Sequence, residues 1–196
     1  MKKLFAHLFT LVTLISFTSC ASYRTNALEP LSAHISFDSS LRGLYWIAKS
    51  FDINDCYTYL DRDVIRKGYR PVQLYIKNES PQTYSFSLDR ISTPIASPQT
   101  VAELVHTSTA GRIIAYSLTG VLIIPAIVDG IKSYKANCAL DRDYFSKTAK
   151  DQILAPYSKM NVILFIPEHT YQDQFTVTLI DVETNQPKVL DIHPSK

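Results

Sequence analysis

The sequence predicts a mainly β protein with a helical insertion, which belongs to the α+β class. Apolar and polar residues alternate in short segments near both ends of the chain, the period becomes helical between residues 97 and 155, and a charge-free stretch lies inside that helical region. Alternation is typical of half-buried strands, whereas spacings of three and four are typical of helices. We therefore expect an antiparallel immunoglobulin-like β-sandwich of about seven strands with an inserted helical hairpin.

The first residues of the chain have the pattern of a secretory leader. Lys2 and Lys3 are followed by an apolar stretch, residues 4–17, and then by the small pair Thr18-Ser19 before Cys20. This order of charged, apolar and small residues is typical of a signal peptide. We expect residues 1–19 to be the leader, 20–30 a tether and 31–196 a single domain. Cleavage after Ser19 or Ala21 of an ordinary leader, or an uncleaved helix, are the alternatives.

Strand patterns follow in chain order. Alternation over Leu31–Phe37 is the first, and residues 160–166, which are apolar on both parities, predict a strand that is covered on both faces. Asn78-Glu79-Ser80-Pro81 and Asn185-Gln186-Pro187 are typical turn sequences. The other predicted strands are residues 43–48, 72–76, 84–88 and 175–179.

The insert at 97–155 contains three helical patterns. Ser97 before Pro98 is an N-cap followed by proline at the first helical position. Residues 113–128 form the uncharged run, and residues 136–154 repeat Phe145, Ala149 and Ile153 at four-residue spacing before Pro156. We expect helices in all three places.

The uncharged run has three readings. As a helix, residues 113–128 would span about 24 Å, which is short of the roughly 30 Å of a bilayer core. Gly111, Ala115 and Thr119 stand four residues apart, so another helix could pack closely against them. The run is a hairpin packed on itself or on the sandwich, a segment, residues 109–131, that inserts into a membrane or oligomerises, or a helix that spans a membrane.

Composition excludes several functions. Lys and Arg number 20 against 18 Asp and Glu, and without Lys2 and Lys3 the charges balance, so we expect no nucleic-acid partner. Only 5 glycines are present, and no phosphate-binding loop is seen. The histidines lack zinc-ligand spacing, and no catalytic motif is found. The pairs Asp61/Asp63 and Asp141/Asp143, each around an arginine, are interpreted as solvated. We expect no enzyme, cofactor or metal site.

Two cysteines remain in the domain if Cys20 belongs to the leader junction. Cys56 and Cys138 are separated by a long stretch of chain, and an oxidising envelope would permit a disulfide between them. Two separate buried thiols are an equally good interpretation.

Phe17-Thr18-Ser19-Cys20 resembles the lipobox of bacterial lipoproteins, with Phe17 in place of the usual leucine. The resemblance implies a leader removed before Cys20 and fatty acyl chains, palmitate among them, on that cysteine. Because no acidic residue directly follows Cys20, it also implies sorting to the outer membrane, facing the periplasm.

A wider resemblance is to a loose group of uncharacterised bacterial lipoproteins that combine a β-sandwich with a small-residue helical insert. It is carried by Gly68–Asn78, Pro125–Gly130 and Ile163–Pro167. It implies no catalytic residue. We therefore expect an envelope-located, non-catalytic binding or scaffold module that is anchored in membrane lipid and recognises another envelope protein or polymer. The membrane-inserting alternative rests on residues 109–131, and a hydrolase is a further alternative.

Overall fold

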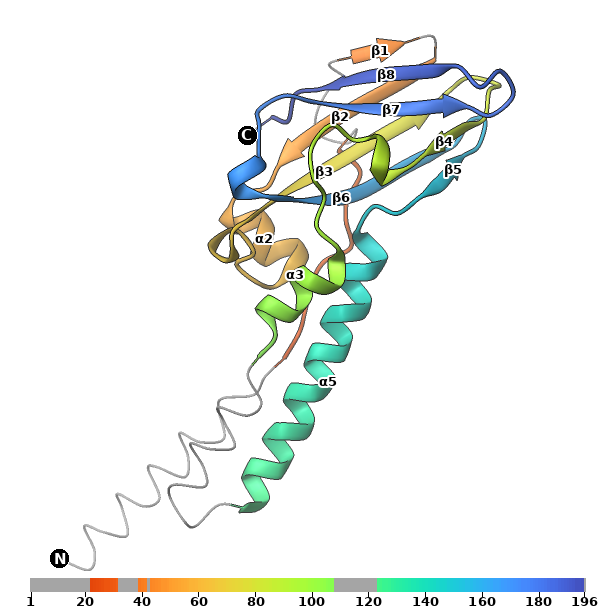
Figure 1. Ribbon diagram of the computed structural model, residues 1–196. Helices are drawn as coiled ribbons and strands as arrows, with labels where there is room; N and C mark the ends of the chain where they lie inside the picture. The colour runs from red at the N-terminus through yellow and green to blue at the C-terminus, as the bar shows by residue number, and fades with distance from the viewer. Residues whose placement is uncertain (1–21, 32–38, 42, 108–122, 196) are drawn as a thin grey trace, which may run out of the picture. The chain divides into compact units, whose positions relative to one another are not determined.

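The protein is described from a computed structural model, which places residues 22–31, 39–41, 43–107 and 123–195 (Figure 1). The chain divides into two compact units. Unit 1 comprises Met1–Tyr23 and His106–Leu140, and unit 2 comprises Arg24–Val105 and Asp141–Lys196. All the strands described here belong to unit 2.

Unit 2 contains two antiparallel sheets. The first has the order β1-β2-β3-β6 and the second the order β5-β4-β7-β8. This confirms the predicted α+β class with antiparallel sheets. The strands of the first sheet are β1 (Ser39–Leu41), β2 (Leu44–Ser50), β3 (Tyr69–Asn78) and β6 (Lys159–Pro167), and those of the second are β5 (Gln152–Leu154), β4 (Tyr84–Phe86), β7 (Phe175–Asp181) and β8 (Pro187–Ile192).

The two sheets pack face to face on one apolar core. Successive side chains of a strand point to opposite faces, and the predicted period of two matches the inward positions. From the first sheet the core takes Leu44, Trp46, Ala48, Val72, Leu74, Ile76, Met160, Val162, Leu164 and Ile166. From the second it takes Tyr84, Phe86, Leu154, Phe175, Val177, Leu179, Leu190 and Ile192.

Four strand predictions are confirmed with small shifts, a fifth strand is shorter than predicted, and β1, β8 and α2 were missed. The strand predicted over residues 84–88 ends at Phe86, and Leu88–Arg90 is a 3₁₀ turn, η3. Strand β8 was missed because Pro187 had been assigned to a turn. Helix α2 (Ile53–Leu60) was also missed, although Asp52 and Asp55 form a capping box at its start. The predicted strand 31–37 lies, apart from Leu31, outside the described residues.

The helical insert is confirmed at its start. Helix α3 (Pro98–Val105) begins where Ser97 Oγ accepts a hydrogen bond from Thr100 N at 3.1 Å. Helix α5 runs over Ile123–Lys147. Among the helices that the structure describes, none has both the length and the apolarity needed to cross a bilayer.

The prediction of a helix up to Leu154 was wrong. Helix α5 ends at Lys147, and Gln152–Leu154 is strand β5, which pairs with β4. Ala149 donates its N–H to Ile163 O at 3.0 Å and is buried in the sandwich core. The four-residue spacing of Phe145, Ala149 and Ile153 therefore does not mark one helix. Phe145 lies in α5, whereas Ala149 bonds to β6 and Ile153 pairs with β4, and this pairing outweighed the local periodicity.

Parts of two edge strands of the sandwich, β6 and β8, are hydrogen-bonded to other segments. On β6, Ile163 O accepts from Ala149 N and Phe165 O accepts from Ala96 N at 2.8 Å. On β8, the indole N–H of Trp46 donates to Asp191 O at 2.8 Å. Ser195 bonds to β2 through Ala48 O at 2.9 Å. Such pairing removes free edge groups that could recruit another strand.

Asn78 organises the turn after β3, and we expect its loss to destabilise the domain. Its Nδ2 donates to Gln82 O at 2.8 Å and to Ala155 O at 2.9 Å, and its Oδ1 accepts from Ser80. Asn78→Ala would leave these buried groups unpaired, so the free energy of unfolding should fall by about 2–3 kcal/mol in chemical denaturation. Gln82→Ala is the control, because its side chain makes none of these bonds. Equal stability of the two variants would contradict this role.

Candidate functional site

The most distinctive feature of unit 2 is a segment at its amino-terminal end, Arg24–Leu31, which we call the strap. Residues 24–30 form no helix or strand, yet polar side chains of the first sheet hold their backbone. Gln73 Nε2 donates to Glu29 O at 2.7 Å, and Asn161 Nδ2 donates to Leu28 O at 3.0 Å. The strap therefore lies across the outer face of β3 and β6.

The side-chain amide of Gln73 has two hydrogen-bond partners, one on the strap and one on β6. Its Nε2 also donates to Asn161 Oδ1 at 2.8 Å, and the side chain is almost completely buried. A buried amide without partners would cost several kcal/mol. Both amides thus need the strap in place, since two of their hydrogen bonds end on its carbonyl oxygens.

Leu31 closes the strap with an apolar contact. It packs with Ile47 of β2 and Tyr75 of β3 in a small cluster separate from the sandwich core. Ile47 and Tyr75 lie on the outward parity of their strands, where a bare sheet face would expose them. They are buried here.

Lys147, the last residue of α5, ties the strap to the helix. Its side chain is 8% exposed, and Nζ lies 2.7 Å from Asp143 Oδ2, 2.8 Å from Asn26 O, 2.8 Å from Tyr59 O and 3.0 Å from Thr25 Oγ1. Four oxygens thus surround one ammonium group. A buried charge requires such pairing, and a cation at the C-terminus of a helix is also favoured by the helix dipole.

Asp143 completes this site. Thr25 Oγ1 donates to Asp143 Oδ2 at 3.1 Å, so Thr25 accepts from Lys147 and donates to its counter-ion. The next residue, Tyr144, donates its OH to Leu60 O at 3.3 Å, and burial raises the pKa of this tyrosine. The site therefore joins the strap, α2 and the end of α5 within unit 2.

Residues 20–30 were predicted to be a tether without periodicity. Residues 22–30 form no helix or strand. From Arg24 onward, however, hydrogen bonds hold the segment on the domain surface, so it is not a free linker. Composition could not indicate this, because the partners of the strap are distant in sequence.

Three of the residues that hold the strap were not singled out in the sequence, namely Gln73, Lys147 and Asn161. Asp143 and Lys147 have the i, i+4 spacing of a helical ion pair, and Asn161 is a polar residue within an apolar strand. Either signal could have drawn attention to them. The pair Asp141/Asp143 had been interpreted as solvated, but Asp143 instead binds Lys147.

Unit 2 also has a small pocket, with a volume of about 310 Å³. One wall carries Arg70, whose guanidinium pairs with Glu168 at 2.7 Å and lies 5.5 Å from the ring centre of Tyr171. The hydrogen bond to Glu168 raises the pKa of Arg70. Because Glu168 already neutralises this arginine, the pocket does not offer an unpaired cation to an anion. Its lining residues are Ser50, Phe51, Asp52, Arg70, Tyr171 and Asp173.

The predicted lipidation and helix-packing residues lie outside the described residues. These are Cys20, Gly111, Ala115 and Thr119. The structure therefore neither brings them together nor separates them.

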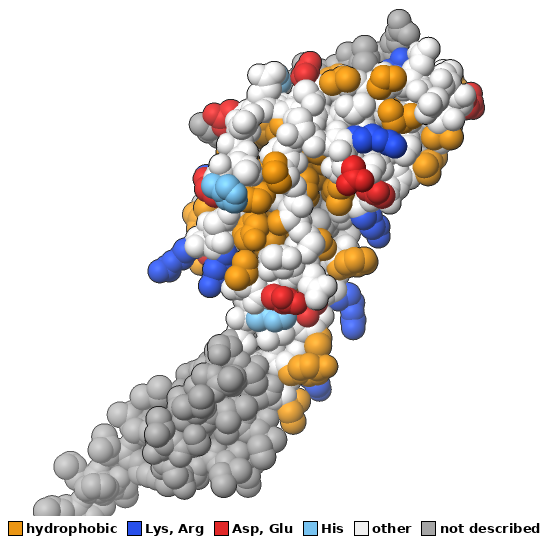
Figure 2. All heavy atoms as spheres, viewed as in Figure 1, with side chains coloured by type: hydrophobic (Ala, Val, Ile, Leu, Met, Phe, Trp, Pro, Cys, Tyr) orange, Lys and Arg blue, Asp and Glu red, His pale blue; other side chains and the backbone are white. Residues whose placement is uncertain are grey.

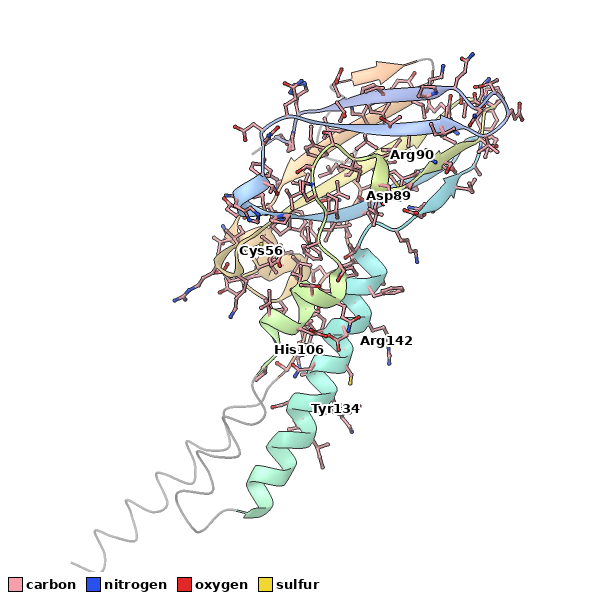
Figure 3. The ribbon with its side chains drawn as sticks, viewed as in Figure 1. Cys56, Asp89, Arg90, His106, Tyr134 and Arg142 are labelled. Carbon is pink, nitrogen blue, oxygen red and sulfur yellow. The ribbon has the colours of Figure 1, made fainter. Side chains whose placement is uncertain are left out.

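The two other cysteines are free thiols. Cys56 is buried on α2 (Figure 3), and its burial raises the thiol pKa to about 11. Cys138 is half-buried on α5 and belongs to unit 1, where its hydrogen bond with Tyr134 raises the pKa of that tyrosine. The interpretation as separate thiols corresponds to this state, and the disulfide stays a prediction for oxidising conditions.

The described part of the chain contains no group of three or more His, Cys, Asp or Glu side chains that could together bind a metal ion. His106 follows α3, and His169 lies in the 3₁₀ turn η4 (Glu168–Thr170).

Comparisons with known proteins gave no match. No protein-family model fits the chain, and neither a curated protein nor a solved structure is similar to it at a significant level.

Removing the Lys147 ammonium should free the strap. Lys147→Met keeps much of the side-chain volume but removes the cation beside Asp143 and the donor to two backbone carbonyls. We expect a loss of about 3 kcal/mol in the free energy of unfolding and faster hydrogen exchange at Asn26, whose N–H bonds to Thr58 O at 3.0 Å. Lys150→Met, an exposed neighbour, is the control. Unchanged protection of Asn26 would show that Lys147 does not hold the strap.

The cysteines should differ in reactivity. In a chain with Cys20→Ala, a thiol reagent at pH 8 should label Cys138 in the native state and Cys56 only after unfolding, as counted by mass. Burial keeps Cys56 protonated, because its folded pKa of about 11 lies above the unfolded value of 9.0. If the two pair in the envelope, neither will react before a reductant is added.

The same shift gives a pH dependence of stability. Since folding raises the pKa of Cys56, its contribution is complete below pH 9.0 and is lost as the pH rises towards about 11. Cys56→Ala should remove this part of the alkaline loss.

Proposed function

We propose that the protein is a lipid-anchored envelope protein, attached through Cys20 to the outer membrane and facing the periplasm, where it acts as a non-catalytic binding or scaffold module. The observation that carries the proposal is the docked strap. The segment that leads to Cys20 is bound to the domain by buried amides and by Lys147, so the domain has a defined attachment point.

Chain length makes the attachment short. Four peptide units separate Cys20 from Arg24, so their Cα atoms are at most about 14 Å apart. A lipoprotein with a long flexible linker could sample a wide volume above the membrane. With this strap, the domain would stay next to the leaflet that holds its acyl chains.

The sheet topology supports an immunoglobulin-like sandwich. The orders β2-β3-β6 and β5-β4-β7-β8 correspond, strand by strand along the chain, to the orders A-B-E and C′-C-F-G found among immunoglobulin-like domains, with β1 added at one edge. In this correspondence α2 lies in the A–B connection and the helical insert in the C–C′ connection. Sandwiches of this kind commonly serve in binding rather than in catalysis.

The two outer faces of the sandwich differ in a way that supports binding. The strap covers the face of β3 and β6, whereas the other sheet exposes Ile153 of β5 and Val189 of β8, which are 60% and 51% exposed. Figure 2 shows hydrophobic side chains on the surface of this unit. Another envelope protein or polymer is the partner that we propose.

A second candidate is a membrane-inserting or oligomerising role for residues 109–131. It is favoured by the contact between Thr25 and Asp143. The segment leading to Cys20 and the part of α5 leading back to the insert therefore leave unit 2 at neighbouring points. If the lipid anchor holds unit 2 at a membrane, the end of α5 that belongs to unit 2 would lie beside the anchored strap.

Replacing Cys20 tests the anchor and separates the two candidates. In Cys20→Ala, incorporation of labelled palmitate should be abolished and the protein should leave the membrane fraction, because no acyl chain remains. Cys138→Ala is the matched control and should be labelled like the wild type. Persistent labelling would overturn the anchor. Loss of label with full membrane retention, in protein whose mass shows that residues 1–19 have been removed, would favour insertion through residues 109–131.

A further inference from the structure

The connection between α2 and β3 forms a compact turn beside the start of the strap. Arg24 N donates to Asp61 Oδ2 at 3.4 Å, and Asp61 is the C-cap of α2. The following residues fold into the 3₁₀ turn η2 (Ile65–Lys67), closed by a hydrogen bond from Gly68 N to Ile65 O at 2.9 Å. We call Arg24, together with residues 61–67, the basic turn.

The carboxylates of the basic turn are used internally. Arg62 Nη1 lies 2.5 Å from Asp61 Oδ2, and Asp63 Oδ1 accepts from Arg66 N at 2.9 Å. The side chains of Arg66 and Lys67 are exposed. No carboxylate of the described residues forms an ion pair with either of them.

The result is a local excess of positive charge. Arg24, Arg62, Arg66 and Lys67 outnumber the two carboxylates, Asp61 and Asp63, by two, although Lys and Arg equal Asp and Glu over residues 20–196 as a whole. Figure 2 shows Lys and Arg side chains, in blue, projecting from this part of the surface.

The chain itself indicates what this surface faces. Arg24 is within about 14 Å of Cys20 along an extended chain. Its backbone N–H donates to Asp61, which belongs to the same basic turn. If Cys20 is acylated, the membrane surface lies within about 14 Å of Arg24, which is less than two screening lengths of roughly 8 Å at physiological salt. Basic residues near an anionic leaflet are attracted to its headgroups.

We propose that the basic turn, through Arg66 and Lys67, binds anionic lipid headgroups of the leaflet that carries the Cys20 anchor. This inference rests on the proposed lipid anchoring. The contact would give the domain a fixed orientation, with the end of the sandwich that carries α2 towards the membrane. At the opposite end of the two strands, Lys77 of β3 lies across from Lys159 of β6 in the strand register. That end would point away from the membrane, about 27 Å further along the strands.

The test uses the full chain with Cys20→Ala, so that acyl chains contribute nothing to binding. Its partition onto vesicles of phosphatidylcholine with 30% phosphatidylglycerol would be measured by flotation, in low salt and in 0.5 M salt. Arg66→Gln with Lys67→Gln should lower the partition coefficient about tenfold to thirtyfold. The control is Lys77→Gln with Lys159→Gln, which removes the same charge at the far end and should change it little.

The salt and lipid controls separate this contact from apolar insertion. The difference between the two double variants should vanish in 0.5 M salt and on pure phosphatidylcholine. Equal partition of the two double variants on anionic vesicles would overturn the inference. Binding of the Cys20→Ala chain with an unchanged basic turn that is the same in low salt and in 0.5 M salt would also overturn it.

Acylation is read out independently, as the mass of the amino-terminal peptide of the wild-type protein. Acylated Cys20 with no effect of the basic turn would overturn the inference and leave the proposed anchor intact. Unmodified Cys20 with a clear effect of the basic turn would overturn the anchor, while the headgroup contact would stand as a membrane-binding surface of its own.

Discussion

Lys147 carries its charge at a position that is 8% exposed, and four oxygens within 3.0 Å surround the ammonium group. Removing one partner of such a site leaves buried charge and carbonyl groups unpaired, which costs far more than the loss of a surface ion pair. The strap, the end of α2 and the end of α5 must therefore occupy their places together. The arrangement of this end of the domain depends on that constraint.

The same logic extends along the strap to the sheet. Gln73 and Asn161 lie on the outer face of β3 and β6, where amides would normally meet water. Here they donate to the carbonyl oxygens of Glu29 and Leu28. The strap thus covers the outer face of β3 and β6, whereas the other sheet has exposed apolar residues such as Ile153. In the proposed function, this asymmetry would give the module one face for attachment and one for a partner.

Attachment and orientation are linked in the proposed function. A lipid anchor alone fixes only distance, because a single point leaves rotation free. A docked strap with a basic turn beside it supplies a second point, at Arg66 and Lys67, and two points restrict how the sandwich stands on a membrane.

The sequence by itself determined the class of the fold and most of its strands. Residues such as Val72, Leu74 and Ile76 alternate with other residues because they face the sandwich core. Ser97 with Pro98 starts α3 through local hydrogen bonding. Both patterns can be recognised from neighbouring residues. Tertiary structure decided what local patterns could not. Residues 152–154 became a strand because β4 pairs with them, and Arg24–Leu31 became a docked strap because Gln73, Asn161 and Lys147, all distant in sequence, need its carbonyl oxygens as partners.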